Sequence, residues 1–172
     1  NGIIAFSRNY ALKRAKTKAV SFLDDDDIWL KDKLSNDYNI LKNKDAFIYS
    51  KCYSFNNQKK IIRTLPIRKI PKKNASYDLL HYGNIFTTSV VSYSLNKLTR
   101  NIFFNESKDF RTWEDYDLWF RLIKDGNLIP CMTKKYGAKY RISESQYSSP
   151  KQDIKNSLMI SNYFKKYYVF YK

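Results

Sequence analysis

The chain has 172 residues, of which 43% are hydrophobic and 17% aromatic, and it carries a formal net charge of +16. This length fits one domain, and the composition supplies enough apolar surface for a core, which argues against a disordered chain. No apolar run approaches the ~18 residues that a membrane-spanning helix needs, and nothing at the start resembles a signal peptide.

In chain order, hydrophobic spacing predicts alternating helices and strands. The first half reads as a helix at 8–16, a strand at 19–23, a helix at 28–44, a strand at 46–55, a turn at 56–58 and a returning strand at 60–65. The second half reads as a loop at 66–75, a helix at 77–82 ending at Gly83, a strand at 85–95, a helix at 114–124 closed by Gly126, a strand pair at 128–142 bent at Gly137, and a helical pattern from Asp153.

Four consecutive aspartates, Asp24 to Asp27, directly follow the apolar run 19–23. In open α/β sheets, ligands bind at the carboxyl edge of the strands, which is where these carboxylates would lie. Like charges this close repel, which is unfavourable unless a cation offsets the repulsion. Oxygen ligands suit Mg²⁺ or Mn²⁺. The alternative is a solvated acidic turn that caps the following helix.

A second acidic group opens the predicted helix at 114–124, where Glu114 and Asp115 lie between Trp113 and Trp119. Acidic residues at a helix start are stabilised by the helix dipole, which alone could explain them. A carboxylate partly desolvated by the flanking aromatic rings could also act as a general base toward a hydroxyl group. Aromatic rings there would suit the apolar faces of a sugar.

The positive charge comes from 32 Lys and Arg against 16 Asp and Glu. It could attract nucleic acid, anionic lipid or phosphorylated substrates, or it could simply reflect the base composition of the genome, since the lysines are scattered. Cys52 and Cys131 are far apart in the sequence, which favours buried thiols in a reducing compartment over a disulfide framework. We expect the only histidine, His81, to be structural rather than catalytic.

Four segments, in this order, resemble the family 2 glycosyltransferases of the GT-A fold. They are Ser7-Arg8-Asn9-Tyr10-Ala11, Phe22-Leu23-Asp24-Asp25-Asp26-Asp27-Ile28-Trp29, Trp113-Glu114-Asp115-Tyr116-Asp117-Leu118-Trp119, and Tyr140-Arg141-Ile142 with the serines that follow. The resemblance implies a GT-A-like, Rossmann-related mixed sheet flanked by helices. It reaches to about residue 149, which predicts a partial glycosyltransferase domain at 1–149 and a basic aromatic helix or tail at 150–172.

The resemblance also implies roles for individual residues. Asp24 and Asp26 match the two aspartates of the family's DxD motif, so they would contact the nucleotide sugar and a divalent ion (Mg²⁺ or Mn²⁺), with Asp26 the more direct metal ligand. Asp25 fills the variable middle position beside the cofactor, and Arg8 would lie on the nucleotide side. Asp115 matches the catalytic base, and Glu114 would orient the acceptor; acceptor contacts are expected at Asn84, Thr88 and Trp113.

The implied activity is an inverting transfer of a sugar from a nucleotide-sugar donor to a saccharide or lipid-linked acceptor, in bacterial surface polysaccharide synthesis such as that of lipopolysaccharide. The expected location is the cytoplasm, with peripheral contact between the tail and an anionic membrane; a tail helix packed on the domain is the alternative. Family members begin with a strand-helix-strand unit that is not in this sequence, so we expect this chain alone to be inactive.

Two other classes of function compete with this interpretation. A basic nucleic-acid-binding module without catalysis would use the positive charge and the aromatic rings, although the strongest motifs are acidic and no nucleic acid partner is expected. A metal-dependent phosphotransferase would use the same aspartates, but the sequence lacks a glycine-rich phosphate loop.

Overall fold

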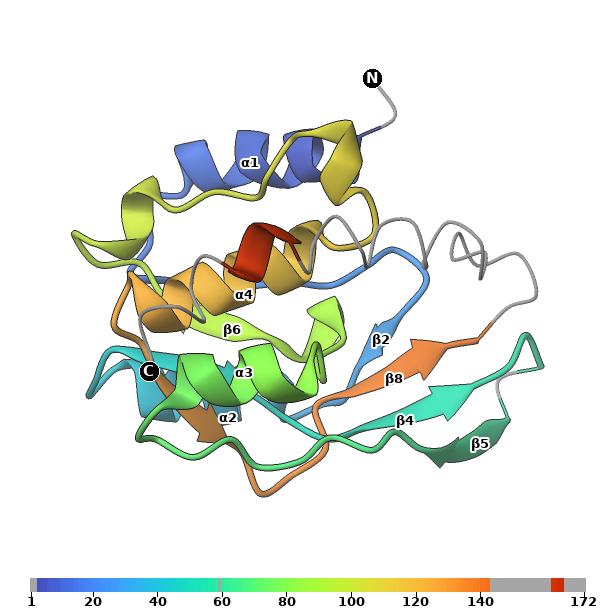
Figure 1. Cartoon of the computed structure of the whole chain (residues 1–172). Helices are drawn as coiled ribbons and strands as arrows, with labels where there is room; N and C mark the ends of the chain where they lie inside the picture. Colours follow the sequence, from blue (N-terminus) through green and yellow to red (C-terminus); the bar gives the residue numbers. More distant parts are fainter. Residues whose placement is uncertain (1–2, 59, 143–161, 166–172) are drawn as a thin grey trace.

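The structure is a computed structural model that describes residues 3–58, 60–142 and 162–165 (Figure 1). Its helices are α1 (Ile4–Arg14), α2 (Lys33–Leu41), α3 (Ala75–Tyr82) and α4 (Glu114–Lys124), with short 3-10 helices η1 (Thr88–Val90), η2 (Thr99–Asn101) and η3 (Lys108–Phe110). Its strands are β1 (Ala19–Ser21), β2 (Ile28–Trp29), β3 (Ala46–Tyr49), β4 (Cys52–Phe55), β5 (Ile61–Thr64), β6 (Ser92–Ser94), β7 (Ile129–Met132) and β8 (Ala138–Arg141). The predicted mixed α/β class is confirmed.

The strands form two mixed four-stranded sheets. One has the order β1-β6-β3-β7 and the other β2-β8-β4-β5, and in each sheet one neighbouring pair is parallel while the others are antiparallel. The second sheet extends away from the helices, whereas α1, α4 and α3 lie over the first (Figure 1). The helices therefore pack on the first sheet, and the second sheet projects to one side of it.

Two chain segments pass from the first sheet into the second. Strand β3 continues into β4, and β7 is followed by β8, with a backbone hydrogen bond of 2.9 Å from the Gly137 N–H to the Lys51 carbonyl at the crossing. A Cβ atom at Gly137 would lie 2.2 Å from Ser50 Oγ and 2.8 Å from Lys33 Cδ. Only glycine fits this crossing without a shift of its neighbours.

The core is aromatic and centres on Trp119 of α4, which is fully buried. Its ring centroid lies 5.5 Å from those of Phe22 and Phe47 and 6.0 Å from that of Phe104, each in an edge-to-face arrangement. These contacts bring together the aspartate-bearing segment after β1, the central strand β3 and the helix that carries the second acidic group.

Several predicted elements differ from the structure because long-range pairing decides them. The helix expected at 28–44 begins only at Lys33, since Ile28 and Trp29 pair with Lys139 and Ala138 of β8. The strand expected at 85–95 contains η1 and shortens to Ser92–Ser94.

The two long strand segments also differ from their predictions. The strand expected at 46–55 is divided between the two sheets, and the expected strand pair at 128–142 is β7 and β8, which lie in different sheets and do not pair with each other. The hairpin of β4 and β5 is confirmed.

Most of the predicted tail, including the helical pattern from Asp153 and the domain boundary near residue 149, lies outside the described residues. Residues 162–165 are helical, and Phe164 is buried against the rings of Tyr116 and Phe120 of α4. This contact supports a packed segment at Phe164, while the division at residue 149 stays a prediction.

The thiols agree in part with their prediction. Both cysteines are free, Cys52 is buried, and Cys131 is half-buried. Burial raises the pKa of the Cys52 thiol to about 11, so it stays protonated at neutral pH.

Candidate active site

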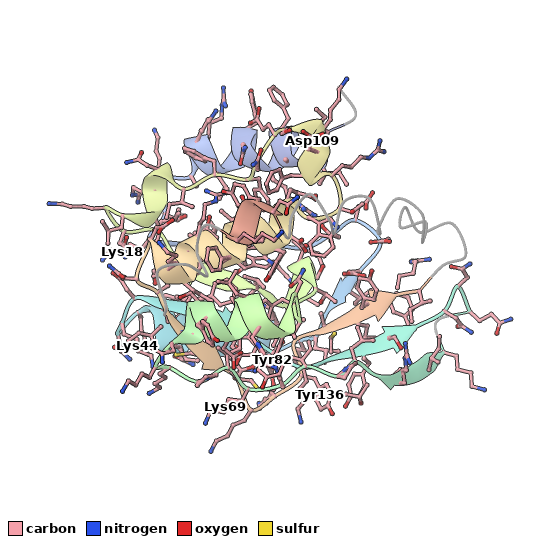
Figure 2. The ribbon with its side chains drawn as sticks, in the orientation of Figure 1. Lys18, Lys44, Lys69, Tyr82, Asp109 and Tyr136 are labelled. Carbon is pink, nitrogen blue, oxygen red and sulfur yellow. The ribbon has the colours of Figure 1, made fainter. Side chains whose placement is uncertain are left out.

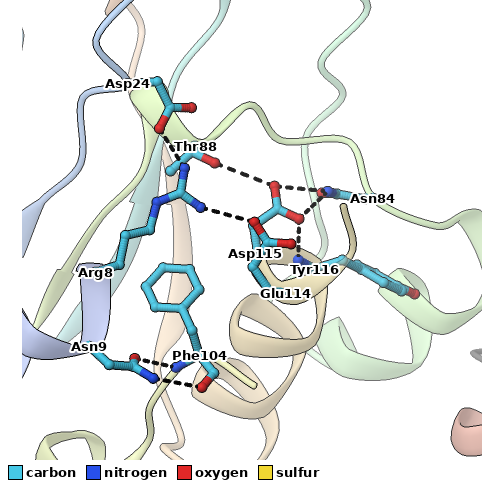
Figure 3. A network of polar contacts seen from close by, with 9 residues as sticks. All are labelled: Arg8, Asn9, Asp24, Asn84, Thr88, Phe104, Glu114, Asp115 and Tyr116. Carbon is cyan, nitrogen blue, oxygen red and sulfur yellow. Dashed lines mark hydrogen bonds and ion pairs between the residues drawn. The ribbon is translucent and has the colours of Figure 1, made fainter. Parts of the chain in front are cut away.

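Arg8 connects the two acidic groups that the sequence singled out (Figure 3). Its Nη2 donates to Asp24 Oδ1 at 2.5 Å, and its Nη1 donates to Glu114 Oε1 at 3.3 Å. The side chains of Arg8 and Glu114 are only 16% and 11% exposed, so these ion pairs are weakly screened by water. The fold therefore brings Asp24, in the segment after β1, and Glu114, at the start of α4, to one place.

The buried amide of Asn9 holds Arg8 and its neighbours in position. Asn9 Nδ2 donates to the Phe104 carbonyl and Asn9 Oδ1 accepts from the Phe104 N–H, both at 2.8 Å, and Asn9 Nδ2 also reaches Glu106. The guanidinium of Arg8 lies over the Phe104 ring, with Cζ 5.3 Å from the centroid. The sequence motif contained Asn9, but nothing in its local pattern indicated a partner almost a hundred residues away.

The aspartate segment is fixed by contacts with η1. The Asp24 N–H donates to Ser89 Oγ at 3.0 Å, and the indole N–H of Trp29 donates to the Ser89 carbonyl at 2.9 Å and the Phe22 carbonyl at 3.2 Å. The Asp27 N–H closes a turn onto the Asp24 carbonyl at 3.1 Å. Asp24 is half-buried, whereas Asp25 and Asp26 are exposed.

Asp27 ties this turn to the end of β8. It is 8% exposed, its Oδ1 accepts from the Arg141 N–H at 2.8 Å, and the Arg141 side chain donates back to the Asp26 carbonyl at 3.0 Å. Burial raises the pKa of Asp27 to about 6, and the charges of Asp26 and Asp24 add to this rise. The sequence alone indicates no separate role for Asp27 or Arg141, and the Tyr140-Arg141 motif is the one signal in it that points to this strand end.

Asp115 lies in the first turn of α4, between α3 and η1. Asn84 Nδ2 donates to both of its carboxylate oxygens at 3.4 and 3.5 Å, Thr88 Oγ1 donates to Oδ2 at 3.4 Å, and the Tyr116 N–H donates to Oδ1 at 2.6 Å (Figure 3). Burial raises the pKa of Asp115 to about 7, and the charge of Glu114 adds to this rise. A carboxyl group with this pKa can accept and release a proton near neutral pH, as a general base must.

The backbone just before α4 is strained. Thr112 has a φ of 74°, in the left-handed region that a β-branched residue rarely adopts. Backbone strain of this kind costs of the order of 1–3 kcal/mol and is often found at functional sites. Here it sets the direction in which the chain enters α4 at Trp113, directly before Glu114 and Asp115.

The two tryptophans of the motif have different environments. Trp113 is half-buried and packs edge-to-face on Tyr116, with centroids 5.8 Å apart, so its ring stays available beside the acidic pair. Trp119 is fully buried in the core, so its ring is not available to stack on a sugar, contrary to the expectation from the sequence. Trp119 lies within α4 and packs on Phe47 of β3, whereas Trp113 precedes the helix. His81 is exposed on α3, with its ring centroid 4.5 Å from that of Tyr82.

The aspartates offer a small donor set for a divalent ion. Within the described ranges, no group of three or more His, Cys, Asp or Glu side chains is placed to hold a metal by itself. Asp26 presents an exposed carboxylate, and Asp24 keeps one oxygen that is not paired with Arg8. Mg²⁺ in nucleotide-dependent enzymes commonly takes one or two carboxylates and completes its shell with phosphate oxygens and waters, so this donor set fits such an ion.

Comparisons with known proteins address the family of the chain. The family model of glycosyl transferase family 2 matches residues 4–100, which is more than half of the chain. The chain is 34% identical over 148 residues to the UDP-Glc:alpha-D-GlcNAc-diphosphoundecaprenol beta-1,3-glucosyltransferase WfgD of Escherichia coli, covering 86% of this chain and 54% of that protein. It is 32% identical over 123 residues to the enzyme WfaP of Escherichia coli, which has the same description, covering 71% of this chain and 45% of that protein.

A third relative is an uncharacterized glycosyltransferase of Rickettsia felis (strain ATCC VR-1525 / URRWXCal2), 33% identical over 132 residues that cover 72% of this chain and 21% of that protein. The chain thus spans about half the length, or less, of the curated relatives it matches. It belongs to glycosyl transferase family 2, and its mixed sheets flanked by helices agree with the GT-A-like fold expected from the sequence. None of these comparisons supports the nucleic-acid-binding alternative.

Proposed function

We propose that this chain forms the metal-binding and acceptor-binding part of an inverting glycosyltransferase. The enzyme would move a sugar from a nucleotide-sugar donor to a lipid-linked saccharide during synthesis of a bacterial surface polysaccharide. The observation that carries this proposal is the Asp115 carboxyl, whose pKa is raised to about 7, set across Glu114 and Arg8 from Asp24. A proton acceptor and a donor-side acidic group then face the same reaction space.

Asp115 would accept the proton of the acceptor hydroxyl as that oxygen attacks the anomeric carbon. The bond from this carbon to the nucleoside diphosphate breaks, and its electron pair leaves with the diphosphate. Asn84 and Thr88 hold the Asp115 carboxylate in place through their hydrogen bonds, so we infer that they orient the base in addition to any contact with the acceptor. General-base assistance of this kind contributes about 10²- to 10⁴-fold in rate.

Asp26 and the free oxygen of Asp24 would hold the divalent ion, which when bound supplies positive charge that stabilises the leaving diphosphate. Arg8 would place its guanidinium on the same side, where charge-assisted hydrogen bonds to phosphate are strong. Asp25 is exposed beside these groups and is available to the donor. With the donor and the metal ion bound at the aspartates, the acceptor would bind on the Asp115 side of the site.

The names of the relatives suggest the substrates. Two of them are described as transferring glucose from UDP-Glc to GlcNAc-diphosphoundecaprenol. We propose the same classes here: a nucleoside-diphosphate sugar as donor and a saccharide linked to a lipid through diphosphate as acceptor. The net charge of +16 suits an acceptor that carries a diphosphate group.

A direct experiment would incubate the full-length protein with Mn²⁺, a lipid-diphosphate GlcNAc acceptor and, in separate reactions, the common UDP-, GDP- and dTDP-sugars. Mass spectrometry would detect the elongated lipid, and NMR would give the configuration of the new bond. We expect one nucleotide sugar to give a product whose anomeric configuration is inverted relative to the donor. A retained configuration, or no transfer from any donor to acceptors with or without the diphosphate, contradicts the proposal.

We also propose that the protein works at the inner face of the cell membrane. Among the residues that the structure describes, no helix is long and apolar enough to cross a membrane. Contact between the positively charged surface and the lipid that carries the acceptor would be peripheral in this proposal. Flotation with anionic and neutral vesicles tests this; equal binding to both removes the electrostatic part. Phe164 is buried against α4, so it is not one of the tail residues that could contact lipid.

A further inference from the structure

Tyr82, the last residue of α3, is a large aromatic residue that is 62% exposed (Figure 2). Arg68, from the loop after β5, lies over one face of its ring, with Cζ 4.3 Å from the centroid. Asp78, one turn earlier on α3, forms an ion pair with Arg68 and so fixes the guanidinium in this position. The Arg68 guanidinium thus covers one face of the Tyr82 ring, although this side chain is on the protein surface.

Only Gly83 separates Tyr82 from Asn84, the residue that contacts the candidate base. Gly83, with a φ of 76°, ends α3 and turns the chain, and the next residue is Asn84, which donates to both oxygens of Asp115. The Cα atoms of Tyr82 and Asn84 are at most about 7 Å apart, because each residue spans at most ~3.6 Å. The backbone of Tyr82 is therefore close to the backbone of the residue whose side chain holds the Asp115 carboxylate.

A supported aromatic ring suits a saccharide. The faces of a pyranose ring are apolar C–H surfaces, and an aromatic side chain offers a flat apolar body with a polar end. Because Arg68 and Asp78 already restrict the ring, less side-chain entropy is lost when a ligand stacks on it. The exposed Lys69, Lys72 and Lys73 in the preceding loop add positive charge that would attract an anionic group on the same ligand.

We propose that Tyr82, supported by Arg68, is the platform on which the saccharide of the acceptor stacks while its hydroxyl reaches Asp115. This inference rests on the proposed function and adds the acceptor subsite to it. We assign the sugar of the acceptor, rather than the lipid surface, as the occupant, since only Gly83 separates Tyr82 from Asn84, which holds Asp115. Arg68 is a positioning residue in this scheme, because it acts through the tyrosine ring.

The test is acceptor kinetics of the full-length protein with a detergent-solubilised lipid-diphosphate GlcNAc acceptor. We expect Tyr82→Ala to raise the KM for the acceptor about tenfold, which corresponds to ~1.4 kcal/mol, while the KM for the donor stays within about twofold. Tyr82→Trp should restore the acceptor KM, because it keeps a flat ring. Circular dichroism and Tm measurements check that each variant is folded.

The matched control is Tyr38→Ala. Tyr38 is 65% exposed on α2 and also has a cation near its ring, with Lys42 Nζ 5.9 Å from the centroid, but α2 contributes nothing to the candidate site. We expect its acceptor KM to equal that of the parent protein. Arg68→Ala should raise the acceptor KM in the same direction as Tyr82→Ala, and the double variant should be no worse than Tyr82→Ala alone, since the two residues act as one unit.

The outcomes separate this inference from the proposed function. An unchanged acceptor KM in Tyr82→Ala, with transfer still present, overturns the platform and leaves the glycosyltransferase proposal standing. Loss of anionic-vesicle binding in Tyr82→Ala without a change in acceptor KM also overturns it, because the ring would then contact lipid. Absence of transfer in the parent protein contradicts the proposed function itself. In that case, saturation-transfer NMR with free GlcNAc-diphosphate tests the platform independently, and an equal signal from the parent and Tyr82→Ala overturns it.

Discussion

The guanidinium of Arg8 lies 2.5 Å from the carboxylate of Asp24, although one residue belongs to α1 and the other follows β1. The same guanidinium reaches Glu114, next to the candidate base Asp115. Arg8 thereby links the donor side of the site electrostatically to the acceptor side. A change of charge on one side should therefore alter the electrostatic potential on the other.

Replacing Arg8 should alter both catalysis and the titration of Asp115. We expect Arg8→Ala to lower kcat/KM about ten- to a hundredfold, in line with the loss of hydrogen bonds to charged groups. The positive charge of Arg8 lowers the pKa of Asp115, so its removal should move the rising limb of the pH–rate profile to higher pH. Arg14→Ala, on the exposed face of α1, is the control; an unshifted profile in Arg8→Ala would refute the link between the two sides.

Metal binding should depend on Asp26. We expect Asp26→Asn to weaken Mn²⁺ binding in the presence of a nucleoside diphosphate at least about tenfold, as measured by electron paramagnetic resonance of free Mn²⁺. Asp125→Asn, at the exposed end of α4, should leave the affinity unchanged. EDTA should abolish transfer and added Mn²⁺ restore it; full activity in EDTA would count against a metal at this site.

The raised pKa of Asp115 makes the folded state sensitive to pH. Its pKa rises from 3.8 to about 7, so between these values the folded protein keeps a proton that the unfolded chain has lost. This carboxyl group therefore favours folding most below about pH 4, and that contribution is lost as the pH rises through 7. Asp115→Asn cannot ionise, so its Tm should exceed that of the parent by more at pH 8 than at pH 5. A constant difference in Tm across this range would mean that Asp115 titrates normally.

The buried amide of Asn9 should contribute to stability. Asn9→Ala leaves the N–H and the carbonyl of Phe104 without their partner, which should cost about 1–3 kcal/mol in the free energy of unfolding. Urea denaturation measures this loss. Asn39→Ala, on the exposed face of α2, should change it by less than about 0.5 kcal/mol. Equal losses in the free energy of unfolding from the two substitutions would show that the hydrogen bonds between Asn9 and Phe104 add little to stability.

Local patterns predicted most elements of the fold, since the apolar spacing of α4 and the buried run of β3 identify these segments without any partner. They failed for Trp29, whose position in β2 depends on pairing with Ala138, more than a hundred residues later. They also failed for Trp119, which sits at a helix position that the motif alone could not assign to the core.

The candidate site shows the same division between local and long-range information. The motifs identified Arg8, Asp24, Glu114 and Asp115, and the structure brings these four residues together. The hydrogen bonds that hold them could not be predicted from local sequence. Asn9 bonds to Phe104 and Asp27 bonds to Arg141, and each pair is far apart in the chain. Tertiary packing, rather than any sequence spacing, produces these contacts.

In the proposed mechanism, Asp115 removes the proton from the acceptor hydroxyl. The most direct test compares Asp115→Asn with the parent full-length protein, measuring single-turnover transfer together with donor binding by calorimetry. We expect transfer to fall by about 10²- to 10⁴-fold while the affinity for the nucleotide sugar stays within a few fold, because the Asp24 side of the site is intact. Transfer at the parent rate, with donor binding preserved, would contradict the assignment of Asp115 as the base.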